Sequence, residues 1–264
     1  MSQQGFHSCQ EPNFDIPHSR PDSLMPYKPK DTTDRYQIYH ERPWVFVGGM
    51  ALSGVAGYVN ALLLQFFRVP VSHMTGAMTH LSIDIAERRT QDLLSTAGII
   101  LGFLCGAVLS GAIIGGGRIQ PGRRYGVALM VEGILLAIAT GLVMEKQQLG
   151  LSIASMACGL QNGMASSYYG LIIRTTHVTG VVTDIGVLLG HWLRHRHIEK
   201  WKLFLLGGVL GGFMAGGILG TIAFQHLQLR ALSIAAIGCC IGGATYYLWQ
   251  HHAQARARRA SIAA

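Results

Sequence analysis

The chain has 264 residues, of which half are hydrophobic, only 13% are charged and 34 are glycine. Soluble domains carry about 25% charged residues, so this composition excludes an ordinary soluble protein and predicts a polytopic membrane protein. The net charge of +8 comes from short basic clusters between apolar segments. Such clusters are typical of topology signals beside membrane spans and form no continuous basic surface. We therefore expect contact with a lipid bilayer and no nucleic-acid partner.

The first 43 residues differ from the rest of the chain. Six of the eight prolines and six of the 13 acidic residues lie before residue 44. A polar, proline-rich segment cannot form a packed core, so we expect a disordered cytoplasmic tail over 1–43. A membrane domain is predicted over 44–250, followed by a short basic cytoplasmic tail over 251–264.

Eight apolar segments make up the predicted membrane domain. Six are long enough to cross a hydrocarbon core of about 30 Å as helices: 44–67, 95–116, 124–144, 150–170, 202–224 and 231–249. Two shorter segments, 71–86 and 176–193, are interrupted by His, Thr, Gly and Asp. Eight crossings result if these two span the bilayer, and six if they dip in and return. Both alternatives place most basic residues, and both termini, on the cytoplasmic side.

An internal repeat runs through these segments. Residues 57–61 (GYVNA) resemble 159–163 (GLQNG), 72–76 (SHMTG) resemble 176–180 (THVTG), and 102–109 resemble 212–219, at offsets of 102, 104 and 110. Three matches in one order indicate a duplication. We predict an all-α fold of two homologous halves, repeat A over 44–145 and repeat B over 150–250. Each half would have three long transmembrane helices and one short polar helix that begins with the pattern HxTG.

Glycine stripes mark the third segment of each half. Small residues recur every four positions at Gly98, Gly102, Gly106 and Ser110, and again at Gly208, Gly212, Gly216 and Gly220. This spacing lets two helix backbones approach closely. The contact could join the two halves or two copies of the chain, so a homo-oligomer through these helices is one expectation.

Polar residues inside the hydrocarbon region should face protein, water or a ligand. Short helices that begin at the two HxTG motifs would present unpaired backbone N–H groups, which attract anions and polar oxygens. We therefore predict a central site for a small polar or anionic solute. Its expected residues come from the repeated motifs: Asn60, His73, Thr75, Gly76, Gln161, Asn162, Thr176, His177, Thr179 and Gly180.

Two carboxylates lie deep within the apolar segments. Glu132 and Asp184 are too far from the segment ends to reach water easily, and intramembrane acids default to a functional hypothesis. We predict that they handle a coupling proton. The structural alternatives are that the histidines cap helices and that Asn60 and Asn162 link helices by hydrogen bonds.

The sequence gives little support for enzyme activity or metal binding. The chain has no HExxH metal pattern and no GxSxG nucleophile elbow. We expect no enzyme activity, no metal site and no cofactor. A solute transporter or exporter is the leading function, and the alternative is a non-transporting scaffold or sensor with residues 1–43 as a partner-binding arm.

The ordered motifs at 57–61, 72–76, 159–163 and 174–180 (RTTHVTG) resemble the YoaK-like family of bacterial multipass membrane proteins. The resemblance covers about 44–250. It implies a bacterial inner-membrane location and six or so crossings. It supplies no substrate, because the family has no settled activity.

Overall fold

A computed structural model describes residues 44–115, 122–166, 175–195 and 200–263, and these are helices joined by turns and short loops. The expected tail at 1–43 lies outside the described residues. The all-α prediction is confirmed, and each of the eight apolar segments contains one helix. The helices are α2 (Trp44–Phe67), α3 (Met74–Ala86), α4 (Thr90–Ile114), α5 (Arg123–Met144), α6 (Leu149–Ser166), α7 (Val178–His195), α8 (Lys200–Leu227) and α9 (Leu232–Ala263), with the 3₁₀ turn η2 (Gln228–Ala231) between the last two.

The outer faces of the long helices are suited to lipid. Four stretches are long and apolar enough to cross a membrane: Phe46–Phe67, Asp92–Ile114, Arg123–Met144 and Lys200–Arg256, the last of which contains both α8 and α9. Large apolar side chains point outward from them, such as Leu104, Met214 and Ile237, which are 58%, 64% and 57% exposed. Helix α6 differs, because most of its residues are buried between α4 and α5. The chain is thus a helical membrane protein.

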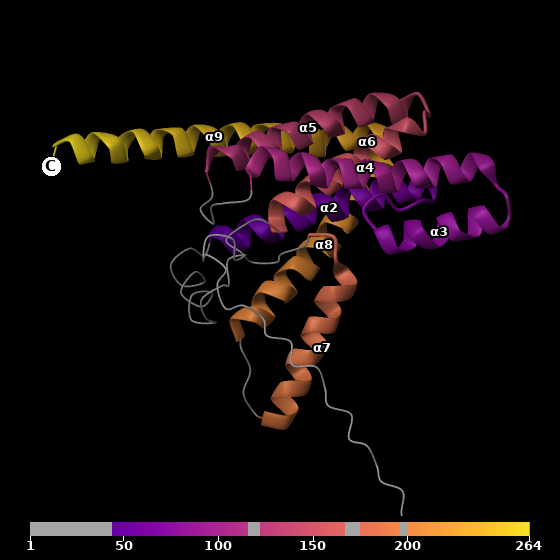
Figure 1. Cartoon of the computed structure of the whole chain (residues 1–264), viewed down its shortest axis with the longest axis horizontal. Helices are drawn as coiled ribbons and strands as arrows, with labels where there is room; N and C mark the ends of the chain where they lie inside the picture. The colour runs from indigo at the N-terminus through magenta and orange to yellow at the C-terminus, as the bar shows by residue number, and fades with distance from the viewer. Residues whose placement is uncertain (1–43, 116–121, 167–174, 196–199, 264) are drawn as a thin grey trace, which may run out of the picture.

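Three helix pairs form the body of the molecule: α2 with α8, α4 with α6, and α5 with α9 (Figure 1). Helices α2 and α8 run in the same direction, because Met50, Gly54 and Tyr58 meet Gly212, Gly216 and Gly220 in ascending order. Helices α4 and α6 also run in the same direction, since Ser152 and Met156 meet Gly102 and Gly106. Helices α5 and α9 run in opposite directions, with Gly126 beside Gly243 and Gly133 beside Ala236.

Glycine brings the backbones of the first two pairs into contact. A Cβ added to Gly57 would overlap the carbonyl oxygen of Phe213, and a Cβ added to Gly159 would overlap that of Phe103. Two buried serines add hydrogen bonds across the same pairs. The Oγ of Ser53 donates to the carbonyl of Val209, and the Oγ of Ser155 donates to that of Ile99, both at 2.8 Å.

The two glycine stripes are therefore used within a single chain. Gly98, Gly102 and Gly106 on α4 face α6, while Gly208, Gly212, Gly216 and Gly220 on α8 face α2. The close helix packing predicted from their spacing is confirmed. Homo-oligomer formation through these helices stays a prediction.

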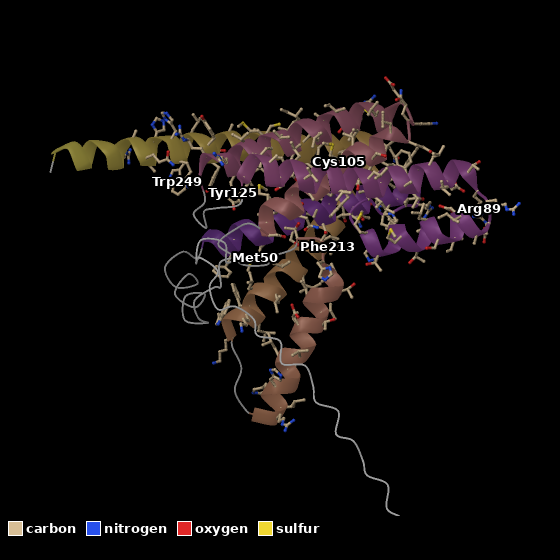
Figure 2. All side chains as sticks on the ribbon, in the orientation of Figure 1. Met50, Arg89, Cys105, Tyr125, Phe213 and Trp249 are labelled. Carbon is tan, nitrogen blue, oxygen red and sulfur yellow. The ribbon has the colours of Figure 1, made fainter. Side chains whose placement is uncertain are left out.

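The helix ends lie at two opposite ends of the bundle. The start of α2 and the end of α9, marked C, lie at one end of the bundle, and the α3–α4 and α5–α6 turns lie at the other (Figure 1). Arg89 in the α3–α4 turn points away from the bundle (Figure 2), where it forms an ion pair with Glu87. Both turns reverse the chain through a residue with positive φ, Arg88 at 55° and Lys146 at 59°.

The short helices α3 and α7 lie outside the three pairs. Helix α3 packs on α4, and α7 packs on α8. With 13 residues, α3 is only about 20 Å long at ~1.5 Å per residue, which is less than the hydrocarbon thickness. Both helices begin near the centre of the molecule and extend outward from it (Figure 1).

The glycine contacts predict a clear difference between two kinds of glycine. We expect Gly57→Ala and Gly159→Ala to lower the free energy of unfolding by roughly 1–3 kcal/mol, because the new methyl group has no space. Gly111→Ala is the control, since nothing lies within 4 Å of its Cβ position, and the helix gains up to about 1 kcal/mol. Unfolding of the purified protein in detergent measures the difference. Equal stability of the three variants would contradict the packing described here.

Candidate functional site

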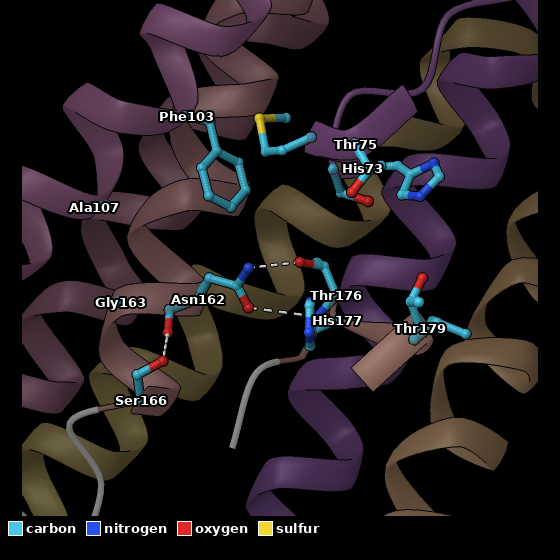
Figure 3. Close-up of a pocket in the computed structure, with 13 residues that line it drawn as sticks. His73, Thr75, Phe103, Ala107, Asn162, Gly163, Ser166, Thr176, His177 and Thr179 are labelled. Carbon is cyan, nitrogen blue, oxygen red and sulfur yellow. Dashed lines mark hydrogen bonds between the residues drawn. The ribbon is translucent and has the colours of Figure 1, made fainter. Parts of the chain in front are cut away.

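The two HxTG motifs meet at one pocket. It has a volume of about 330 Å³, which is at the lower end of the range for small-molecule sites. The starts of α3 and α7 contribute most of its lining, and α4 and α6 contribute the rest (Figure 3). The lining residues are Ser72, His73, Met74, Thr75, Phe103, Ala107, Asn162, Gly163, Ser166, Thr176, His177, Val178 and Thr179.

The two short helices begin with the same hydrogen-bond pattern. The first intrahelical bond of α3 runs from the N–H of Ala77 to the carbonyl of His73, and that of α7 from the N–H of Val181 to the carbonyl of His177, both at 3.1 Å. The N–H groups of the preceding helical residues have no carbonyl partner in their own helix. Because these residues begin at the pocket wall, the positive ends of both helices are directed toward it.

A glycine lies beside each imidazole. A Cβ added to Gly76 would be 2.9 Å from Nδ1 of His73, and a Cβ added to Gly180 would overlap the ring of His177. Each ring therefore folds back over the first turn of its own helix, in space that only glycine leaves free. Neither His73 nor any other side chain caps the start of α3 with a hydrogen bond, so the capping alternative does not describe His73.

Two asparagines hold the helix starts in place. The Nδ2 of Asn162 donates to Oγ1 of Thr176 at 2.5 Å, and its Oδ1 accepts from Oγ1 of Thr175 at 3.0 Å and from the N–H of Thr176 at 3.4 Å. The Oδ1 of Asn60 accepts from the N–H of Ser72 at 3.3 Å. Both asparagines thus connect a long helix to the segment that leads into a short helix. Asn162 also lines the pocket, whereas Asn60 does not.

The remaining predicted site residues lie elsewhere. The Nε2 of Gln161 donates to the carbonyl of Leu52 at 2.8 Å, so this side chain faces α2 and does not line the pocket. Asp184 is on an exposed face of α7, beyond the turn that lines the pocket. Two threonines outside the predicted set, Thr79 and Thr183, donate hydrogen bonds to carbonyls of their own helices, at 3.0 Å and 2.9 Å.

Glu132 occupies a separate buried position. It is 2% exposed on α5 and lies beside Cys239 on α9. Its second oxygen, Oε2, has no hydrogen-bond partner in the described structure, and neither does Oε1 of Gln161. Buried polar atoms without partners are rare exceptions in proteins. No group of three His, Cys, Asp or Glu side chains in the described residues could hold a metal ion.

Sequence reasoning missed several residues that matter here. Phe103 and Ala107 lie on the glycine-striped helix α4, which was interpreted as packing alone, yet they form one wall of the pocket. Ser53 was also overlooked, although it recurs as Ser155 at the same offset of 102 that relates the first motifs. A buried serine repeated in register is a signal that the sequence does contain.

The lining offers hydroxyl, amide and imidazole groups together with the two helix N-termini. It contains no carboxylate, lysine or arginine among the described residues. Such a site can hold a small polar molecule through hydrogen bonds, and the two helix dipoles favour negative charge.

Comparisons with known proteins place the chain in a family without giving it an activity. No curated protein and no solved structure matches it. Residues 48–245 match the family described as "Protein of unknown function (DUF1275)", which agrees with the resemblance to YoaK-like proteins. The match covers most of the helical membrane domain, and the chain belongs to this DUF1275 family.

Proposed function

We propose that the chain is a secondary transporter of a small polar or anionic solute in the bacterial inner membrane. One observation carries the proposal: two short polar helices that lie 104 residues apart in the chain begin at the same pocket. Transporters commonly place such interrupted helices around a solute near the middle of the bilayer. The class of solute follows from the lining, which has many hydrogen-bond donors and, among the described residues, no carboxylate, lysine or arginine.

Helix directions support six crossings. With six, α2 and α8 cross in one direction, α4 and α6 cross in the other, and α5 and α9 cross in opposite directions. The directions of all three pairs agree with this arrangement. Eight crossings would require α5 and α9 to run in the same direction. The two short helices then extend from the pocket toward opposite faces, α3 to the outside and α7 to the cytoplasm, and an even number of crossings puts both termini on one side.

Matching contacts support two homologous halves. The first helix of each half packs on the third helix of the other half, α2 on α8 and α6 on α4. The contacts correspond at the repeat offsets: Gly57 to Phe213 matches Gly159 to Phe103, and Ser53 to Val209 matches Ser155 to Ile99. Three crossings in each half give the halves opposite orientations, a geometry that recurs in secondary transporters.

Proton coupling is the proposed role of Glu132 and Asp184. Glu132 is buried among α5, α6 and α9 with one oxygen unpartnered, and intramembrane carboxylates in transporters often belong to proton relays. Its separation from the pocket lining means that it would act on the solute through helix movement. Asp184 is on α7, the same short helix that carries His177 and Thr179, so it could move with the pocket wall.

Labelling of single cysteines tests the six-crossing topology. In a variant without the native cysteines, we expect Thr90→Cys and Gln148→Cys to react with a membrane-impermeant thiol reagent added to whole cells. Both positions lie in or beside the turns at the end of the bundle opposite the start of α2 and the end of α9. The control His252→Cys on α9 should react only after the cells are permeabilised. Protection of Thr90→Cys and Gln148→Cys from outside reagent would favour eight crossings.

A thermal-shift screen tests the solute site. Purified protein is melted with chloride, nitrate, formate, acetate, phosphate or sulfate, and with glycerol as the neutral comparison. We expect at least one anion to stabilise the protein, by about 2.7 kcal/mol at a concentration of 100 times its Kd. His177→Ala should reduce the shift because it removes a pocket donor, whereas His80→Ala, on an exposed part of α3 outside the pocket, should retain it.

The solute from this screen is then offered to proteoliposomes. Uptake that requires the protein supports transport. Binding without uptake would favour the sensor alternative, and the absence of any selective shift would contradict the proposed site.

If Glu132 or Asp184 couples solute to protons, its loss should affect uptake driven by a pH gradient but not exchange of solute for solute. We expect Glu132→Gln to abolish uptake driven by a pH gradient while exchange of labelled for unlabelled solute continues, because the amide keeps the shape of the side chain but cannot exchange a proton. Asp184→Asn receives the same two measurements. Glu145→Gln is the control, since Glu145 is exposed at the end of α5. Unchanged gradient-driven uptake in both variants would exclude these residues from coupling.

A further inference from the structure

The pocket lies to one side of the pseudo-two-fold axis that would relate the two halves. Both helix starts contribute to it equally, but among the described residues its other walls come from α4 and α6, through residues that include Phe103, Ala107 and Asn162. At the repeat offsets their counterparts are Phe213, Gly217 and Asn60, on α8 and α2. None of these three counterparts is among the described residues that line the pocket. Symmetric parts therefore form an asymmetric site.

On the opposite side, hydrogen bonds hold the segment before α7 against α2 and α8. The Oγ of Ser53 lies 3.0 Å from the carbonyl of Thr175 and 2.8 Å from that of Val209, which ties the start of α7 to α2 and α8. The void between them, partly lined by Phe213, has no space for a water molecule. On the pocket side, Ser155 donates to Ile99 and to no residue of the α3 start in the described chain.

The two asparagines show the same asymmetry. Asn162 makes three hydrogen bonds to the segment before α7, whereas Asn60 accepts one bond of 3.3 Å from the segment before α3. The residues that could change this are already in place, because Ser72, the counterpart of Thr176, carries a hydroxyl that Asn60 could bind. Exchanging the conformations of the two halves would give Asn60 the backbone and hydroxyl contacts of Ser72, whereas Val71, the counterpart of Thr175, has no hydroxyl group for the third contact.

We infer that the chain forms a second solute pocket, between the same two helix starts but on the side of α2 and α8, with Asn60, Phe213 and Gly217 in its wall. The first pocket closes when the second opens. In the six-crossing arrangement Ala107 lies toward the cytoplasmic end of α4 and Gly217 toward the outer end of α8, so the two pockets open to opposite sides. The inference rests on the proposed function, since a carrier must present its site to each side in turn.

The two pockets differ in ways that the sequence defines. Ser166 in the wall of the first pocket corresponds to Leu64, and Ala107 corresponds to Gly217. The second pocket therefore lacks one hydroxyl group that the first has, and it exchanges the methyl group of Ala107 for that of Ala61, the counterpart of Gly163. It should hold the same solute with fewer hydrogen bonds, so release is favoured on the outer side.

Accessibility of matched cysteines tests the second pocket. Ala107→Cys and Gly217→Cys are each made in the full chain without native cysteines. A Cβ at position 217 would lie 3.7 Å from Cβ of Ala61, an ordinary contact that should be tolerated. An impermeant methanethiosulfonate reagent is applied to right-side-out and inverted membrane vesicles. We expect Gly217→Cys to react only in right-side-out vesicles and Ala107→Cys only in inverted ones.

A second variant tests whether the pockets alternate. Ala107→Trp fills the first pocket, so it should make the labelling of Gly217→Cys several-fold faster. Leu104→Trp is the control, because Leu104 lies on the same helix but faces outward. If Ala107→Trp does not fold, Ala107→Phe repeats the measurement with a smaller ring. Reaction of both cysteines from the same side, no reaction at Gly217→Cys, or equal rates in the Trp variants would overturn the inference.

The labelling needs no solute, so its outcome is separate from that of the flux assay. Solute uptake together with failed labelling would leave the proposed function standing without the second pocket. The expected labelling without binding or uptake of any anion would overturn the proposed solute class and function, and would leave the two accessible faces to be explained by another activity.

Discussion

The rest of this structure depends on the close approach of helix backbones within two pairs, α2 with α8 and α4 with α6. In a bilayer, helices gain no hydrophobic energy by leaving lipid for one another, so association relies on dense packing and on a few hydrogen bonds. Gly57 and Gly159 provide that density by letting the carbonyls of Phe213 and Phe103 rest on the neighbouring backbone. The serine hydrogen bonds of Ser53 and Ser155 then align each pair along its length.

These contacts determine where polar groups can collect. Because α4 and α6 are in contact near Phe103 and Gly159, Asn162 on the next turn of α6 reaches the segment that precedes α7. Thr175 and Thr176 lie before the first turn of α7, so their backbone polar groups need partners outside that helix. The amide of Asn162 and the neighbouring threonine hydroxyls supply them. The described backbone before α7 is therefore stabilised by protein side chains, and the first turn of each short helix lines the pocket.

The sequence was informative about elements and less so about their arrangement. Apolar segments bounded by proline and charge located the helices α2 to α9 that the structure describes, and the four-residue glycine period correctly predicted close packing. The partners of the glycine stripes could not be deduced, because a stripe on α8 does not reveal whether α2 or a second chain covers it. In the site, the HxTG repeat indicated that His73 and His177 would lie at related positions. It could not show that Gln161 turns away toward Leu52 while its neighbour Asn162 lines the pocket.

The exchanged pairing of helices has a consequence for biosynthesis. Helix α2 leaves the ribosome about 150 residues before α8, and individual helices enter the bilayer before they associate. During that interval the small-residue face of α2 is covered only by lipid acyl chains or by the insertion machinery. Neither half could reach its final packing alone, since each supplies the partner that the other lacks. A ribosome that stalls after residue 145 would leave an inserted but unassembled fragment, a natural target for membrane proteases.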